Sequence, residues 1–309
     1  MGAPFVRGRF EELPELPRVP HPYGRTTARD VSVHSKHFGD VRIHLREHGN
    51  GPPLLLVHGL MTTSYSYRYV LERLGQKHRL LIPDLPGCGQ SDKPDTTYGP
   101  AALATFLGEF VDALGIRGCV TVGNSMGGYL CMRAVLRDPT IFSKLVNVHS
   151  PAFPELRLRA MNALLQVPGV AAGLSAFVQR DVLRWAHRNV HYFDESLKSL
   201  EEAHAYGDPL ATPEGMRAFT RYLRDAMSAL GLAEFSSELQ QRKVQNLPFP
   251  IPLCLIYARH DPLVPASVGA RLAPLVPDAQ LHWLEDTSHF AHVDTPGPVA
   301  DLVEMFFAS

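Results

Sequence analysis

The sequence predicts an α/β protein with a mostly parallel, doubly wound sheet and one helical insertion. Short apolar runs, typical of strands buried on both faces, alternate with helix-like segments as far as residue 150. The alternation stops over 151–246, where apolar residues recur at helical spacing, and then resumes. We therefore predict a core made of residues 31–150 and 247–309, with a helical cap over 151–246.

The expected elements follow from these runs in order. In the first half, strands are expected at 41–45, 54–57, 79–82, 119–122 and 145–148. Helices between them are expected at 67–74, at 101–114 and directly after Ser125. The second half supplies strands at 252–257 and 281–284 and a final helix at 298–307.

Residues 1–30 are predicted to form an irregular arm ahead of the core. The arm has no hydrophobic period and contains Pro4, Pro14, Pro17, Pro20 and Pro22. The segment Met1–Val6 lacks the charged-then-apolar profile of a secretory signal. No apolar run approaches the ~18 residues of a membrane span. We therefore expect a cytoplasmic protein without a membrane span.

Composition and charge argue against several classes of partner. The formal net charge is −1 and the sequence pI is about 6.9, so nothing favours nucleic acid or an anionic membrane. No phosphate-binding or dinucleotide-binding glycine pattern and no metal-spaced motif occurs, so we expect no cofactor and no metal. Cys119 and Cys254 lie inside apolar runs and are expected to be buried free thiols. The oligomeric state stays open.

The most informative motif is Gly123-Asn124-Ser125-Met126-Gly127, which lies between an apolar strand and a helix. A G-x-S-x-G in that position is a nucleophile elbow. The turn is so sharp that the serine backbone is strained, and side chains two positions away would collide. Glycine on both sides removes that crowding, because it has no Cβ. The motif predicts Ser125 as a nucleophile.

A serine hydroxyl needs a neighbouring base to take its proton. Asp261 follows the expected strand 252–257, and His289 follows the expected strand 281–284. Nucleophile, then acid, then histidine is one of the chain orders in which such triads occur. We predict that His289 is the base and that Asp261 accepts its N–H. A turn-capping Asp261 and a histidine on a surface loop are the structural alternatives.

Other residues compete for these roles. Asp286 is the alternative acid, although it is too close in sequence to His289 to orient it easily. The strand that ends at Val148 is followed by no Asp or Glu, and Asp84 is expected to organise a loop. Four other histidines compete with His289. His58 and His149 are expected to line the site, His282 alternates within a strand, and His292 belongs to the following segment.

The oxyanion of an acyl-transfer intermediate needs preorganised donors. One is the backbone N–H of Met126, the residue after the nucleophile. The second is expected from the loop His58-Gly59-Leu60, as the backbone N–H of Leu60. The side chains of Leu60 and Met126 are then free to shape the pocket.

These residues resemble the α/β-hydrolase superfamily, and within it the capped branch of haloalkane dehalogenases, epoxide hydrolases and meta-cleavage C–C hydrolases. The resemblance covers about residues 35–150 and 250–305, and the cap matches only in position. The stretches similar to dehalogenases and epoxide hydrolases are His58-Gly59, Thr63-Ser64-Tyr65, Pro83–Gly87 and Ser91–Pro94. Gly-Asn-Ser-Met-Gly-Gly at 123–128 resembles the elbow of the C–C hydrolases.

The departures from this branch point to ester hydrolysis. Dehalogenases and epoxide hydrolases use an aspartate nucleophile, where this chain has Ser125. Dehalogenases bind halide with Trp and often Asn, but Met126 and Leu60 stand there and cannot donate a side-chain hydrogen bond. Epoxide hydrolases have proline at the position of Met61, and C–C hydrolases usually have Trp at the position of Phe290.

The cap sequence suggests a hydrophobic substrate, because it offers the apolar residues Leu164, Val167, Phe177, Trp185 and Phe193. Its polar candidates are Arg180, Arg184 and Arg188, which form either a solvated face or a carboxylate clamp, and Tyr192, Tyr206 and Tyr222, which could polarise a substrate oxygen. We predict a serine hydrolase, a carboxylesterase acting on a small-molecule ester through an acyl-enzyme. The alternatives are C–C hydrolysis of a vinylogous diketone, which needs an arginine facing Ser125, and a slow-turnover ligand receptor.

Overall fold

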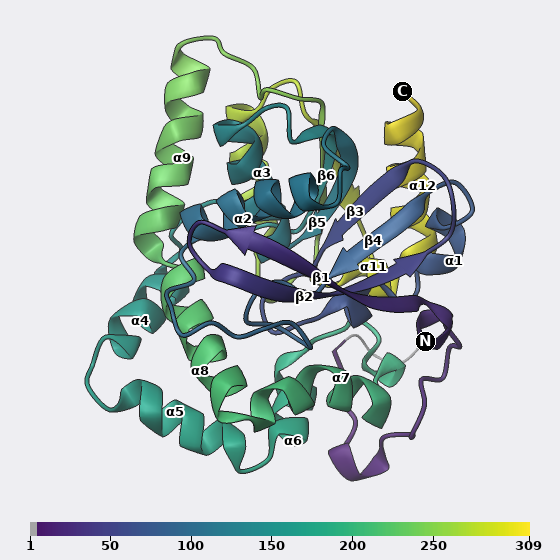
Figure 1. Cartoon of the computed structure of the whole chain (residues 1–309), viewed down its shortest axis with the longest axis vertical. Helices are drawn as coiled ribbons and strands as arrows, with labels where there is room; N and C mark the ends of the chain where they lie inside the picture. The colour runs from purple at the N-terminus through teal and green to yellow at the C-terminus, as the bar shows by residue number, and fades with distance from the viewer. Residues whose placement is uncertain (1–4) are drawn as a thin grey trace.

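A computed structural model describes residues 5–309, and its centre is one eight-stranded sheet (Figure 1). The strand order is β1-β2-β4-β3-β5-β6-β7-β8. Strands β1 and β4 both run antiparallel to β2, and every other neighbouring pair is parallel. The bounds are β1 Thr27–Ser35, β2 Gly39–His48, β3 Pro53–Val57, β4 Arg79–Pro83, β5 Cys119–Asn124, β6 Phe142–Val148, β7 Leu253–Ala258 and β8 Gln280–Leu284.

Helices cover both faces of this sheet, as the sequence predicts for a doubly wound fold. The core helices are α1 Leu71–Leu74, α2 Pro100–Ala113, α3 Met126–Arg137, α10 Ala266–Leu272, α11 Ala291–Asp294 and α12 Pro296–Ala308. Successive residues of a strand point to opposite faces. Leu55 and Val57 therefore pack in one cluster with α2, α3 and α10, whereas Leu54 and Leu56 pack in a second cluster with α1 and α12.

The chain between β6 and β7 is helical. It forms α4 Leu156–Leu165, α5 Val170–Gln179, α6 Val182–Asn189, α7 Leu200–Ala211, α8 Pro213–Arg221, a π-helical turn Tyr222–Ala226 and α9 Ala229–Val244. Helices α4 to α8 gather at one end of the sheet, and α9 returns along its side (Figure 1). The starts of α6 to α9 are fixed by side-chain caps from Asp181, Ser199, Thr212 and Ser228.

The short helices α10 and α11 are not among the expected elements, and two elements ahead of Ser125 also differ from the sequence prediction. The expected helix 67–74 is a 3-10 turn, Ser64–Tyr67, followed by the short α1. Strand β1 was not predicted and begins at Thr27, inside the expected arm. Its buried residues Val31, Val33 and Ser35 alternate with exposed polar ones, and it pairs only with β2 at the sheet edge. Such an edge strand carries little apolar signal.

The described part of the arm contains 3-10 turns at Phe10–Glu12 and Tyr23–Arg25, while Pro4 and its predecessors lie outside the described residues. Cys119, Cys131 and Cys254 are buried free thiols, and Cys88 is a partly buried one. Within residues 5–309 no helix by itself has the length and apolar character to cross a membrane. Helices α4 and α5 have that length and apolar character only when they are taken together, and they are bent by 98° relative to each other.

Candidate active site

Ser125 occupies the turn between β5 and α3 with φ of 53° and ψ of −122°. A positive φ is strained for a residue with a side chain. The turn is held by the backbone N–H of Ser125, which donates to the carbonyl of Val148 at 2.8 Å. A Cβ on Gly127 would lie 2.2 Å from the carbonyl oxygen of Val57, and one on Gly123 would lie 2.6 Å from Gly128 Cα. Any side chain at either flanking position would therefore overlap neighbouring backbone atoms, so both positions need glycine.

Gly127→Ala is expected to destabilise the protein by about 3 kcal/mol or more, because the new methyl group would overlap rigid strand backbone. The measurement is the free energy of unfolding in urea. Gly108→Ala is the matched control, since a Cβ in that part of α2 meets only Ile141 Cδ1, at 3.8 Å. A Gly127→Ala protein as stable as wild type would contradict the close approach described above.

Asp261 and His289 lie at the ends of the neighbouring parallel strands β7 and β8. His289 Nδ1 is 2.6 Å from Asp261 Oδ2, and both side chains are buried. The other carboxylate oxygen, Oδ1, accepts the backbone N–H groups of Leu263 at 2.7 Å and Val264 at 2.8 Å. The carboxylate is thus fixed on one side by a backbone turn and on the other by the imidazole.

Charge and hydrogen bonding set the state of this pair. Burial raises the pKa of Asp261, but His289 and the hydrogen bonds to the carboxylate outweigh it and hold that pKa below its usual value. An ionised Asp261 accepts the proton on Nδ1 and so leaves Nε2 of His289 as an acceptor. That is the tautomer that a general base needs.

The residue before the nucleophile brings His289 to the elbow. Asn124 Nδ2 donates to the carbonyl of His289 at 3.2 Å and lies 3.3 Å from the carbonyl of Val148. One buried amide therefore connects the end of β6, the elbow and the loop after β8. Asn124 is a site residue that the sequence analysis noted only as part of the motif.

The loop that carries Leu60 presses against the nucleophile. A Cβ on Gly59 would lie 3.1 Å from Ser125 Cβ, so a larger residue there would have to displace the nucleophile or the loop by a few tenths of an ångström. His58 Nδ1 donates to the carbonyl of Gly59 at 2.8 Å, and its Nε2 accepts the backbone N–H of Leu85 at 3.0 Å. Burial lowers the pKa of His58 and keeps the ring neutral. His58 thus supports this loop, as expected of a lining residue.

The competing acid and bases lie in other settings. Asp286 is exposed, whereas Asp261 already binds His289. His149 has a φ of 56° and its ring centre lies 5.9 Å from that of His289. Burial lowers the pKa of His149 to about 4, so the ring is neutral at pH 7. The ring of His292 stacks on that of Tyr67, with 4.9 Å between the ring centres.

Several cap residues face away from any substrate. Leu164, Val167 and Phe177 are 57%, 50% and 58% exposed. Arg184 pairs with Glu11 at 2.6 Å and with Asp181 at 3.1 Å. The other two apolar candidates, Trp185 and Phe193, are partly buried, and Trp185 packs on Phe219. The hydroxyl of Tyr192 donates to Glu202, and that of Tyr222 donates to the carbonyl of Pro86. Arg180 and Arg188 are exposed. The arginine stripe is therefore a solvated face.

Two adjoining cavities lie between the cap and the core. The larger, of about 520 Å³, lies between α7 and the loops that follow β3 and β4, and its lining includes the charged residues Asp84, Lys93 and Glu201. The smaller, of about 30 Å³, is lined by Leu60, Met61, Leu210, Phe219 and Tyr206 among others. Both are bordered by Thr63, Gly89 and Pro209. The smaller cavity reaches Leu60, in the loop that packs against Ser125, whereas Ser125 and His289 are not among the described residues that line either cavity.

The sheet order, the elbow and the paired acid and histidine can be compared with known proteins. A family model described as alpha/beta hydrolase fold matches residues 52–296. The chain belongs to the α/β-hydrolase fold family. The resemblance seen in the sequence is therefore confirmed, as is the fold class. This family and its relatives identify the protein as a hydrolase, without specifying the bond that it cleaves.

Named relatives of this α/β-hydrolase come from several activities. It is 27% identical over 286 residues to an uncharacterized hydrolase, YugF, of Bacillus subtilis, covering 92% of this chain and 97% of that protein. It is 27% identical over 278 residues to a 2-hydroxy-6-oxo-6-phenylhexa-2,4-dienoate hydrolase of Burkholderia cepacia, covering 86% and 91%. Haloalkane dehalogenases are also among its relatives. The solved structure of the epoxide hydrolase CorEH shares the fold, with a TM-score of 0.76, 20% identity and coverage of 92% and 99%.

Proposed function

We propose that this α/β-hydrolase is a serine hydrolase that cleaves a hydrophobic small-molecule ester, as a carboxylesterase does. One observation carries the proposal. Asp261 Oδ2 lies 2.6 Å from His289 Nδ1, and the side-chain amide of Asn124, next to the strained Ser125, donates to the backbone carbonyl of the same histidine. This arrangement supports a base directed at the nucleophile.

In the proposed first step, Ser125 Oγ attacks the ester carbonyl while His289 Nε2 takes the hydroxyl proton. The backbone N–H groups of Leu60 and Met126 donate to the resulting oxyanion, and Asp261 stabilises the imidazolium. The oxyanion collapses, the C–O bond of the ester breaks, and the alcohol leaves with the proton from His289. Water then attacks the acyl-enzyme, with His289 as base again, and releases the acid and free Ser125.

The identity of the nucleophile separates this proposal from two activities found among the relatives. The family resemblance implies an aspartate nucleophile for haloalkane dehalogenases and epoxide hydrolases. A serine hydroxyl needs the neighbouring base that His289 offers, and it suits acyl transfer to water. Because Arg180 and Arg188 are exposed and Arg184 pairs with Glu11 and Asp181, this stripe does not form a carboxylate clamp and gives no support to the C–C hydrolase alternative.

A hydrophobic substrate is supported by the smaller cavity. Leu60, Met61, Leu210 and Phe219 line it, so the part of the ester nearest the oxyanion loop would meet apolar side chains. The larger cavity, whose lining includes several charged side chains, would admit water and the released alcohol.

Leu210→Trp should narrow the smaller cavity and so slow the hydrolysis of esters with long acyl chains more than that of short ones. We expect kcat/KM for p-nitrophenyl hexanoate to fall about tenfold, and that for the acetate to fall about twofold, because an apolar contact of a methylene group is worth about 1 kcal/mol or more. Leu230→Trp, at an exposed position of α9, is the control and should change neither value. Equal losses of kcat/KM for both esters would argue against the smaller cavity as the binding site of the acyl chain.

The decisive experiment is a turnover screen of the purified protein against p-nitrophenyl esters of graded length and one vinylogous diketone. Ester turnover without diketone cleavage is the result that the proposal expects. Diketone cleavage alone would replace it with C–C hydrolysis. Labelling of Ser125 by a fluorophosphonate without measurable steady-state turnover would indicate a slow-turnover receptor.

A further inference from the structure

One carboxylate joins the cap to the loop that carries His289. Asp294, at the end of α11, accepts hydrogen bonds with both of its oxygens. Oδ2 accepts the backbone N–H of Ser288 at 2.8 Å and its hydroxyl at 2.5 Å. Oδ1 accepts the backbone N–H of Phe193, in the cap, at 2.9 Å. Each oxygen thus serves a different part of the chain, and Ser288 directly precedes His289.

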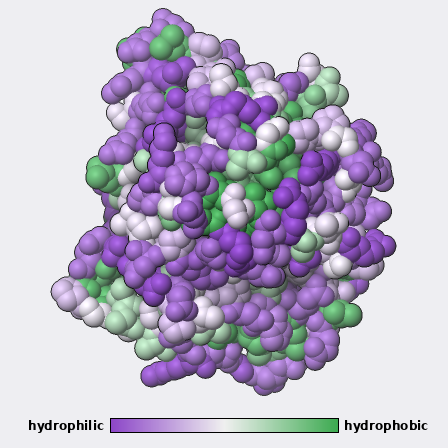
Figure 2. Space-filling model, in the orientation of Figure 1, coloured by the Kyte–Doolittle hydropathy of each residue, from purple (hydrophilic) through white to green (hydrophobic). Residues whose placement is uncertain are grey.

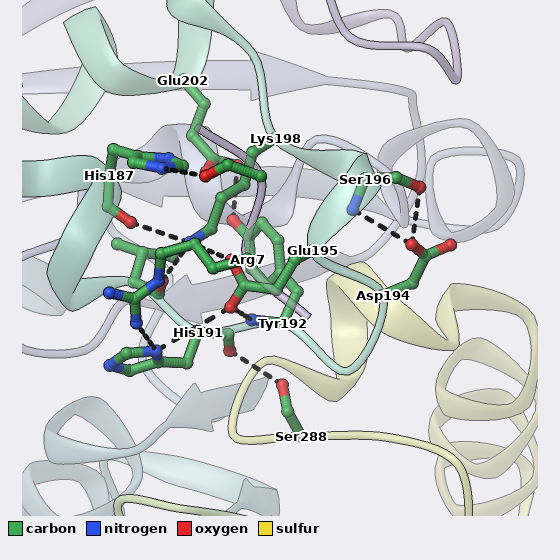
Figure 3. A network of polar contacts seen from close by, with 12 residues as sticks. Arg7, His187, His191, Tyr192, Asp194, Glu195, Ser196, Lys198, Glu202 and Ser288 are labelled. Carbon is green, nitrogen blue, oxygen red and sulfur yellow. Dashed lines mark hydrogen bonds and ion pairs between the residues drawn. The ribbon is translucent and has the colours of Figure 1, made fainter. Parts of the chain in front are cut away.

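A second set of contacts links the same cap segment to the site. The hydroxyl of Ser288 lies 3.0 Å from the carbonyl of His191, and Figure 3 shows it directed at that segment. The ring of Phe193 lies 5.9 Å from the ring of His260, the neighbour of Asp261. Residues 191–193 therefore contact both loops that carry the acid and the base.

The cap segment is itself held in a fixed shape by a buried ion pair. Lys198 pairs with Glu195, and both side chains are almost fully buried. Lys198 Nζ also donates to the carbonyls of His187 at 2.8 Å and Val190 at 2.5 Å, at the end of α6 (Figure 3). These carbonyls would otherwise lack partners, because they lie in the last turn of a helix. Glu195 Oε1 accepts the backbone N–H of Tyr192 at 3.3 Å.

We propose that Asp294 is a positioning residue that couples the placement of the cap to that of His289. A rigid cap segment sets the position of the Asp294 carboxylate through Phe193, and the carboxylate sets Ser288 and hence the backbone of its neighbour. The kinetic part of this inference rests on the proposed serine hydrolase function. A misplacement of about 1 Å at a catalytic group costs about a hundredfold in rate.

The side-chain chemistry makes Asp294→Asn a sharp test. Three donors converge on the two oxygens of Asp294, and an asparagine offers one acceptor oxygen and one amide nitrogen that donates. Either the N–H of Phe193 or that of Ser288 must then face another donor. Burial raises the pKa of Asp294 to about 6 against these hydrogen bonds, so the group is mainly ionised above pH 7 and the variant removes a carboxylate.

Asp194→Asn is the matched control. Asp194 lies in the same cap segment and also accepts a backbone N–H, that of Ser196 at 3.0 Å. Its other carboxylate oxygen binds Arg18 of the N-terminal arm at 2.8 Å, so its side chain makes no contact with the loop of His289. Figure 3 shows Asp194 joined to Ser196 and not to Ser288. Ser288→Ala and Ser288→Thr form a second pair, since only threonine keeps the hydroxyl.

Two readouts are compared in the full-length protein. For Asp294→Asn we expect kcat and the rate of Ser125 labelling by a fluorophosphonate to fall about 10- to 100-fold, with KM changed less than about threefold. Hydrogen exchange should become faster in peptides that cover both 190–194 and 286–290. Ser288→Ala should show the same losses more weakly, whereas Ser288→Thr should have wild-type kcat and wild-type exchange. Asp194→Asn should alter neither kcat nor exchange in 286–290.

The outcomes separate this inference from the proposed function. Wild-type kcat and wild-type exchange at 286–290 in Asp294→Asn would overturn the coupling. A change of exchange confined to 190–194 would overturn it too. If the wild-type protein hydrolyses no ester and is not labelled, the proposed function fails, and the exchange data still decide whether Asp294 joins the two segments.

Discussion

Ser125→Ala is expected to lower kcat for p-nitrophenyl ester hydrolysis by about 10⁴-fold or more. Without the hydroxyl no acyl-enzyme can form, and His289 has no proton to take from the protein. The measurement is initial rate against ester concentration, with freshly purified wild-type and variant proteins compared at equal concentration. A variant that retained more than about a tenth of kcat would require a different nucleophile.

The loss should arise from chemistry and not from unfolding. Alanine keeps the Cβ of Ser125 and is strained at its positive φ to the same degree, so the melting temperature should change little. Ser150→Ala is a control at the neighbouring strand end. Ser150 Oγ accepts from Asn147 at 2.6 Å, so this variant should lose about 1 kcal/mol of stability and keep its activity.

Asp261→Asn is the second large effect, a decrease in kcat of about 10⁴-fold. Oδ1 of Asp261 accepts two backbone N–H groups, at 2.7 and 2.8 Å, so the asparagine must turn its oxygen toward them. Its NH₂ group then faces His289 Nδ1, which has to become the acceptor. The histidine proton moves to Nε2, and that nitrogen can no longer accept the proton of Ser125.

Initial rates between pH 6 and 9 provide the measurement for Asp261→Asn. The matched control is Asp286→Asn, an exposed carboxylate between β8 and His289 that was the alternative acid in the sequence. It should retain wild-type kcat. If Asp286→Asn were the inactive variant and Asp261→Asn the active one, the assignment of the acid would be reversed.

The parts of the site that follow from local sequence were predictable. Ser125 is marked by its two glycines, because the contacts at Gly123 and Gly127 exclude any larger residue. Asp261 and His289 each follow a strand of a parallel sheet, and the carboxyl ends of such strands meet at one edge. Their hydrogen bond therefore agrees with a prediction made from chain order and strand position alone.

The parts that depend on distant contacts could not be predicted. Nothing in the sequence around Asn124 indicates that its amide reaches His289, 165 residues later. Strand β1 is stabilised by pairing with β2, and its alternation is too short and polar to be recognised alone.

The cap presents the same difficulty in the placement of its side chains. Helical spacing identified a face that carries Arg184, but not whether that face points inward or outward. In the structure Arg184 pairs with Glu11 of the N-terminal arm, a partner 173 residues away in sequence. Periodicity describes one helix, whereas orientation depends on which surfaces pack, so the carboxylate clamp stayed open until the fold was known.

The most direct measurement of the central claim is peptide mapping by mass spectrometry after reaction with a fluorophosphonate. Wild-type protein and a His289→Ala variant are compared over a time course. We predict a single phosphonyl group on Ser125 in wild type and labelling at least about a thousandfold slower in His289→Ala. A label on any other residue, or equal labelling rates in the two proteins, would contradict it.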